Sequence, residues 1–158
     1  MILRRILLIL LVLAVAGPAW LWQHKRAPVP VPATAIAGRF AMQDSGKTVL
    51  DRISGLHWQQ GFSATTMTQA AALTWCSANT PALPGTGWRL PTSHELEDLA
   101  DSQAASPAID AVFAGTPSEF FWSATPWVSG GNAWVVDFYY GRSYYDGSSS
   151  AFRVRCVR

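Results

Sequence analysis

A long apolar run at the N-terminus divides this chain into an export segment and a domain. Arg4 and Arg5 precede the uninterrupted apolar stretch 6–16, and apolar residues continue to Trp22, ahead of the basic residues at 24–26. Basic residues followed by such a stretch are typical of a signal peptide or a membrane anchor. The rest of the chain is then about 120 residues long, which fits one domain with a single hydrophobic core.

Two interpretations of residues 1–26 stay open. Ala14-Val15-Ala16 offers small residues at the spacing that signal peptidase recognises, which favours a cleaved signal peptide. The stretch to Trp22 is just long enough to span a bilayer, and tryptophans beside basic residues resemble an interfacial belt, which favours an uncleaved single-pass anchor. Both interpretations place the domain outside the cytoplasm, in the periplasm or on the cell surface. Membrane contact is expected only through this segment.

Residues 27–38 contain three prolines and no charge, so we expect an extended linker between the N-terminal segment and a domain at 39–158. Four of the chain's twelve basic residues lie before the linker, which leaves eight basic against ten acidic residues in the domain, a formal charge of −2. A mildly acidic domain without a cluster of basic residues is not typical of nucleic-acid binding.

The chain has two cysteines, Cys76 and Cys156, and neither belongs to a Cys-x-x-Cys pair. An even number of cysteines behind an export signal favours one long-range disulfide. Two free, buried thiols in a reducing compartment are the alternative.

The predicted elements follow the order strands, helices, strands, which indicates an α+β fold. Thr92 and Glu95 form a capping box at the start of one helix. The predicted strands are 39–42, a hairpin over 49–58, 121–125, 133–138 and 152–158; the predicted helices are 66–79, one beginning at Thr92, and a short one over 108–113.

Side-chain periodicity predicts which faces are buried. In the first helix these are Ala70, Ala71, Leu73 and Trp75, and in the second Leu96 and Leu99. In the last two strands the inward residues would be Trp134, Val136, Phe138, Phe152, Val154 and Cys156. The residues between them, Val135, Asp137, Tyr139, Arg153 and Arg155, would face outward. We also expect core positions for Trp58, Trp75, Trp88 and Trp122, whereas Trp127, beside two glycines, is expected to be exposed.

Six ordered motifs between Arg39 and the last residue resemble one family. They are Asp51-x-x-x-Gly-Leu-x-Trp58, the helix ending at Cys76, Trp88-Arg-Leu-Pro-Thr-x-x-Glu-Leu96, Phe121-Trp-Ser123, Ala133-Trp-x-Val-x-Phe-x-x-Gly141 and Val154-Arg-Cys-Val-Arg158. The family is the domain found at the C-terminus of the Legionella collagen-like adhesin, which occurs in bacterial envelope proteins. The resemblance implies a C-type-lectin-like fold, as in formylglycine-generating enzyme, with a disulfide between the first helical region and the final strand.

The four tyrosines of the chain all fall within residues 135–152, a stretch otherwise rich in Ser, Gly and Asp. This composition is typical of antibody contact loops, where Tyr supplies wide amphipathic contact and Ser and Gly adapt to the ligand. We therefore predict ligand contact by Val135, Asp137, Tyr139, Tyr140, Arg142, Tyr144, Tyr145, Asp146, Ser148 and Trp127.

The same stretch resembles the variable region of proteins diversified by retroelements, in which adenines of Asn codons are randomised. A randomised AAC codon cannot encode Lys, Gln, Glu, Met or Trp, and none of these occurs between Val135 and Arg158. An ordinary member of the family with an exposed loop and strand fits equally well, so both interpretations stay open.

No catalytic residue, metal site or cofactor is predicted. His57 lies near Asp51 and His94 beside Glu95, but structural roles are favoured for both histidines, and the spacing of Asp44, Asp51 and Asp110 fits no known cation loop. The leading hypothesis is non-catalytic recognition of a protein or glycan outside the cell. A structural subunit of an envelope assembly is the second hypothesis, and an enzyme related to formylglycine-generating enzyme is the third.

Overall fold

The computed structural model of the protein describes residues 38–128 and 130–158. The predictions for the N-terminal segment and for most of the linker lie outside the described residues. Within the described part, no helix combines the length and the apolar character needed to cross a bilayer.

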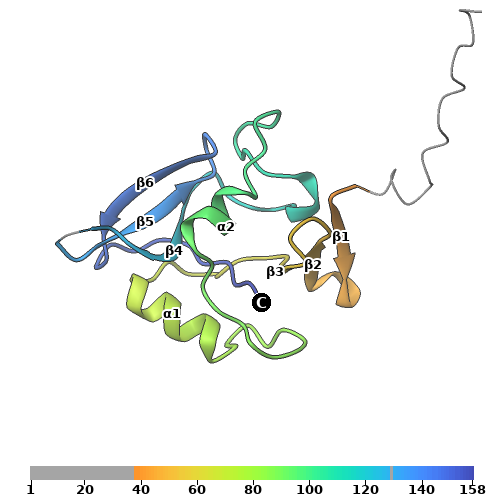
Figure 1. Ribbon diagram of the computed structural model, residues 1–158, viewed down its shortest axis with the longest axis horizontal. Helices are drawn as coiled ribbons and strands as arrows, with labels where there is room; N and C mark the ends of the chain where they lie inside the picture. The colour runs from red at the N-terminus through yellow and green to blue at the C-terminus, as the bar shows by residue number, and fades with distance from the viewer. Residues whose placement is uncertain (1–37, 129) are drawn as a thin grey trace, which may run out of the picture. The chain divides into compact units, whose positions relative to one another are not determined.

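Two three-stranded antiparallel sheets form the framework of the domain (Figure 1). The first sheet has the order β1-β2-β3, with β1 at Phe40–Gln43, β2 at Thr48–Asp51 and β3 at His57–Gln59. The second has the order β4-β5-β6, with β4 at Phe120–Pro126, β5 at Asn132–Asp137 and β6 at Arg142–Gly147. In Figure 1, β1 and β2 lie at one end of the domain and β6 at the other, with α2 between them.

Two short α-helices connect the sheets, α1 at Gln69–Ser77 and α2 at Ser93–Glu97, and 3₁₀ turns occur at Asp44–Gly46 and Ala111–Phe113. The predicted capping box is present, because the Thr92 side chain accepts from Glu95 N and the Glu95 side chain accepts from Thr92 N. These elements confirm the α+β class. The helix expected over 108–113 is wrong, since only one 3₁₀ turn forms there.

The core has two parts, one on each face of β5. Val136 packs on one face with Phe121, Leu96 and Leu99, and Val135 packs on the other with Trp122. Core side chains therefore cover both faces of β5, as in the buried strands of layered folds. The predicted outward positions of Val135 and Asp137 are therefore wrong: their exposed fractions are 1% and 6%.

The buried face of α1 also differs from the prediction. Ala72 and Cys76 are buried, whereas Ala70, Ala71 and Leu73 are exposed and Trp75 is half-buried. The bond from Cys76 to Cys156 turns the Cys76 side of α1 toward the core. Leu96 and Leu99 are buried as predicted. Of the tryptophans expected in the core, Trp58, Trp88 and Trp122 are buried, and Trp134 is half-buried.

The predicted last strand, 152–158, is instead an extended segment that forms isolated bridges with both sheets. Val157 bridges to Trp58 in β3, and Arg153 bridges to Phe121 in β4. Arg155 was expected to face outward, but its exposed fraction is 0% because the segment has neighbours on both sides.

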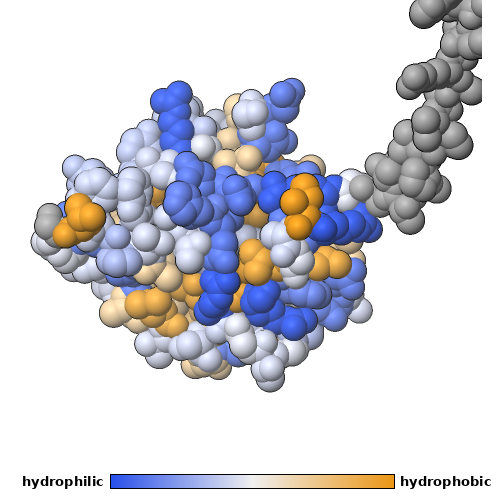
Figure 2. Space-filling view, viewed as in Figure 1, coloured by the Kyte–Doolittle hydropathy of each residue, from blue (hydrophilic) through white to orange (hydrophobic). Residues whose placement is uncertain are grey.

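The surface seen in Figure 2 mixes hydrophilic side chains with separate apolar patches. The large exposed apolar and aromatic side chains are Met42, Ile53, Leu73, Val128 and the four tyrosines. Scattered apolar residues are ordinary on soluble domains, whereas clustered aromatics suggest a contact site.

Cys76 and Cys156 form a disulfide between α1 and the C-terminal segment, across 80 residues of sequence, which confirms the predicted pairing. We expect the double variant Cys76→Ala/Cys156→Ala to lose about 3–5 kcal/mol of unfolding free energy, because the unfolded chain regains the entropy of that loop. Urea denaturation of the variant and the parent protein measures the difference. A change below about 1 kcal/mol would show that packing alone holds the segment in place.

Candidate functional site

The predicted contact residues lie mostly on the β5–β6 hairpin. Trp134 is opposite Tyr145 in the ladder and Val135 is opposite Tyr144. Residues opposite each other in a ladder share a face, and successive residues alternate between faces. Tyr145 therefore lies on the Trp134 face and Tyr144 on the Val135 face. The sequence had suggested that the tyrosines form one continuous surface. Instead they divide among the two faces of the β5–β6 hairpin and the turn between its strands.

A cleft of about 390 Å³ opens on the Trp134 face, where α2 covers the sheet. Its lining combines one indole with five polar side chains: Ser93, His94, Glu97, Thr125, Trp134 and Ser143. The Ser143 hydroxyl is shielded from solvent and has no hydrogen-bond partner in the described structure. Shielded hydroxyls normally have a partner, so this group keeps an unused hydrogen-bonding capacity at the wall of the cleft.

Three aromatic rings adjoin the cleft, and we call Trp127, Trp134 and Tyr145 the aromatic cluster. Trp127 stacks on Tyr145 with 4.4 Å between ring centroids and 9° between planes. Trp134 meets Trp127 edge-on, with centroids 4.8 Å apart. Trp127 is thus half-buried within the cluster rather than freely exposed, and it keeps the rings in a fixed arrangement.

The opposite face of the sheet carries a second, smaller hollow of about 300 Å³. Tyr144 packs edge-on against Phe120 on this face, and Phe120 contacts Phe152. The hollow is lined by Thr66, Ser118, Glu119, Phe120, Asp137, Ala151 and Phe152. Although Asp137 reaches this lining, its Oδ1 accepts a hydrogen bond from Tyr139 N, so it also holds the start of the turn.

Tyr139 and Tyr140 occupy the turn between β5 and β6, and their rings meet edge-on at 4.5 Å. The Arg142 guanidinium lies 6.0 Å from the Tyr140 ring centroid. Gly141 closes the turn at φ 66°, and a Cβ there would meet Ala100 and Ala108 at 3.2 Å. The turn is therefore seated on the domain while its tyrosines face solvent.

Asp146 and Ser148 hold the loop after β6. Asp146 Oδ1 accepts hydrogen bonds from Gly147 N at 2.7 Å and Ser150 Oγ at 2.6 Å. The backbone of Ser148 donates to Gly131 O and accepts from Gln69 N. These two predicted contact residues thus have structural partners in addition to any ligand.

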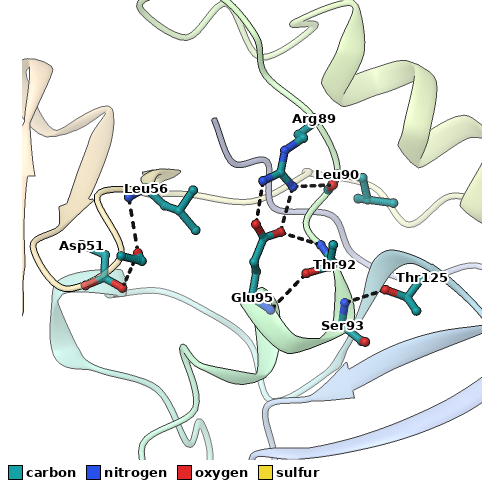
Figure 3. A network of polar contacts seen from close by, with 9 residues as sticks. Asp51, Leu56, Arg89, Leu90, Thr92, Ser93, Glu95 and Thr125 are labelled. Carbon is teal, nitrogen blue, oxygen red and sulfur yellow. Dashed lines mark hydrogen bonds and ion pairs between the residues drawn. The ribbon is translucent and has the colours of Figure 1, made fainter.

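An ion pair between Arg89 and Glu95 positions α2 (Figure 3). This helix supplies three residues of the cleft. Arg89 donates two hydrogen bonds to Glu95, at 2.8 and 2.6 Å, and Thr92 N donates a third at 2.8 Å. The principal partner of Arg89 is therefore Glu95, and its bond to the Leu90 carbonyl is longer, at 3.5 Å. Ser93 N donates to Thr125 Oγ1 at 2.9 Å and ties α2 to β4.

The bonds from Arg89 lower the pKa of Glu95 to about 2; the two bonds with Thr92 act in the same direction, whereas burial opposes them. In Asp51, burial acts to raise the pKa, but bonds from Arg39, Ile53 N and Ser54 together lower it. Neither carboxylate is free to pair with a histidine. Among the described residues, no group of three His, Cys, Asp or Glu side chains is arranged to hold a metal ion.

Sequence reasoning missed most of the cleft. Ser93, Glu97, Thr125 and Ser143 were not singled out, and Trp134 was assigned to the core. Ser143 could have been found from the hairpin register, because it is opposite Val136 and so lies on the Trp134 face. The contribution of α2 could not have been found from the sequence, since it depends on how a helix some fifty residues away in sequence packs on the sheet.

The family of the chain is decided by a match over most of its length. The model of the Lcl C-terminal domain family matches residues 47–158. This chain belongs to the Lcl C-terminal domain family. The match confirms the resemblance based on the six motifs and covers both sheets from β2 onward. A search of curated proteins gave no match to the Lcl domain described here.

We expect the Arg89–Glu95 pair to make folding sensitive to acid. The pKa of Glu95 is about 2 in the folded protein, against its ordinary value of 4.5 in the unfolded chain. The contribution of this carboxylate to stability is therefore complete above pH 4.5 and is lost as the pH falls toward 2. Glu95→Gln should therefore flatten the fall of the unfolding free energy between pH 4.5 and 2.

Denaturation curves across this pH range measure the effect. Glu97→Gln is the matched control, because it removes a carboxylate from the same helix and leaves the Arg89 network intact. An unchanged slope in Glu95→Gln would show that the ion pair does not contribute to acid sensitivity.

Proposed function

We propose that this Lcl domain is a non-catalytic recognition module that binds a protein or glycan outside the cytoplasm. The observation that carries the proposal is the cleft beside Trp134, with its indole wall and unpartnered Ser143 hydroxyl. Binding sites commonly combine apolar walls with a few convergent polar groups. The family and the disulfide are those of an adhesin-like, extracytoplasmic protein.

The chemistry of the cleft favours a glycan over a protein side chain. Sugar rings carry hydroxyls on their edges and C–H groups on their faces, so they need several hydrogen-bonding partners beside an aromatic surface. Ser93, Thr125 and Ser143 offer hydroxyls, Glu97 an acceptor and His94 a nitrogen donor or acceptor. Trp134 and the rest of the aromatic cluster offer the ring surface.

A protein ligand would instead use the exposed turn. Tyr139, Tyr140 and Arg142 project there, and Tyr and Arg dominate the energetics of protein interfaces. The turn and the cleft are separate surfaces, so variants of each can be made without altering the other.

Several observations favour recognition over catalysis. Both cysteines of the chain are joined in the disulfide, so neither can supply the thiol chemistry of formylglycine-generating relatives. Glu95 and Asp51, the acidic neighbours of the two histidines, are engaged by arginines. A C-type-lectin-like fold, a cleaved signal or anchor at 1–26 and the linker at 27–38 remain parts of this proposal. A structural subunit of an envelope assembly is the alternative to it.

Retroelement diversification remains a prediction, and burial limits where it could act. Val135 and Asp137 lie in the interior, where most substitutions would disturb packing. Tyr139, Tyr140, Tyr144 and Tyr145 are exposed and could vary at little cost to folding. A template repeat with Asn codons at these positions, beside a reverse transcriptase gene, would establish diversification.

The full-length chain, screened on an array of neutral and acidic oligosaccharides, should bind a glycan through the cleft. Ser143→Ala and Glu97→Ala should each weaken that binding about tenfold, because each removes one side-chain group of the cleft that would hydrogen-bond to the ligand. Ser143→Ala should leave folding intact, since the hydroxyl has no partner within the described protein.

Tyr140→Ala is the matched control, an exposed site outside the cleft. If glycan binding survives both cleft variants and is lost in Tyr140→Ala, the turn is the binding site. If no glycan binds, the glycan proposal fails, and a protein ligand would have to be sought with the turn variants.

A further inference from the structure

The outer edge of β6 has no neighbouring strand in the described domain. β6 is the last strand in the order β4-β5-β6, and no element covers it in Figure 1. An edge strand presents unpaired backbone N–H and C=O groups that can pair with another strand. Proteins usually protect such edges with charges, prolines or bulges.

The charges on β6 are arranged symmetrically about Tyr144. Arg142 lies two residues before it and Asp146 two residues after it, so all three side chains share one face of the strand. Neither charge forms an ion pair within residues 38–128 and 130–158. Asp146 uses only Oδ1 in the bonds described above, which leaves Oδ2 available.

We propose that β6 pairs antiparallel with β6 of a second copy of this chain, about a two-fold axis at Tyr144. In this register Arg142 lies opposite Asp146 of the second copy, and Asp146 opposite its Arg142. Tyr144 lies opposite Tyr144. Such a contact is self-complementary, as a two-fold interface requires, and it joins two three-stranded sheets into one.

Other antiparallel registers lack this complementarity. The smallest shift of the register that keeps the same face of both β6 strands on one side of the sheet is two residues. This shift removes both Arg142–Asp146 pairs. A larger slip places Arg142 opposite Arg142, or Asp146 opposite Asp146, and like charges directly opposite each other are destabilising. The charges thus disfavour unrelated strands and favour one register of self-pairing. The contact does not involve the Trp134 cleft, so its failure would leave the proposed glycan binding untouched.

Cysteine cross-linking tests the register directly. In an antiparallel pair the facing Cα atoms lie about 4.5–5.5 Å apart, a distance that a disulfide can bridge. Under mild oxidation, full-length Tyr144→Cys in detergent should give several-fold more covalent dimer than Tyr140→Cys. Tyr140 is the stricter control because its exposed fraction is 64%, against 42% for Tyr144, so random collision would favour it. Equal or greater cross-linking of Tyr140→Cys overturns the proposal.

The charge pairs are tested in the Tyr144→Cys background. Adding Arg142→Glu should reduce the dimer several-fold, because the new carboxylate would face Asp146 of the second copy. Adding Arg142→Lys instead should keep most of the covalent dimer, because the positive charge opposite Asp146 remains. Peptide mapping must show Cys76–Cys156 intact in each variant. If Arg142→Glu cross-links as efficiently as Arg142→Lys, the charges do not set the register and the proposal fails.

Discussion

The two sheets depend on the extended segment 152–158, which hydrogen-bonds to both of them. Its backbone accepts from Gln59 N and Ser63 N on one side and from Trp122 N on the other. Val154, Cys156 and Val157 fill the two parts of the core. Neither sheet contributes a strand to the other, so this segment links the two sheets through backbone hydrogen bonds, while α2 packs on the second sheet.

Arg155 shows how that segment is accommodated. Its guanidinium is fully buried without a carboxylate partner, and burial lowers its pKa to about 9. Nε donates to Gly61 O at 3.0 Å, and Nη2 donates to Thr116 Oγ1 at 2.7 Å and to Gln60 O at 3.2 Å. The rings of Phe113 and Phe121 lie 4.7 and 5.6 Å from the guanidinium carbon. Two carbonyls, the Thr116 hydroxyl and the ring faces thus replace water around most of the guanidinium, although Nη1 has no partner among the described residues, and the two carbonyl bonds anchor the loop at 60–61.

The sequence was informative where the signal lay in neighbouring residues. The Thr92 capping box, the hairpin over 49–58 and the β5 strand were all predicted because each depends on local chemistry. Periodicity failed for Val135 and Arg155, because alternation distinguishes inside from outside only when one face meets solvent. The cleft was missed for a related reason: the side chains that line it come from three strands and a helix, and only tertiary packing brings them together.

The alternation of Tyr144 and Tyr145 between faces has an evolutionary consequence. Substitutions at these neighbouring positions alter surfaces that do not touch each other. A change at 145 affects the aromatic cluster, and a change at 144 affects the Phe120 side of the sheet and the outer edge of β6. Substitutions at the two positions should therefore be nearly additive, with little epistasis between them. Selection could then adjust the proposed ligand binding and the proposed self-association independently, although both proposals involve a single short strand.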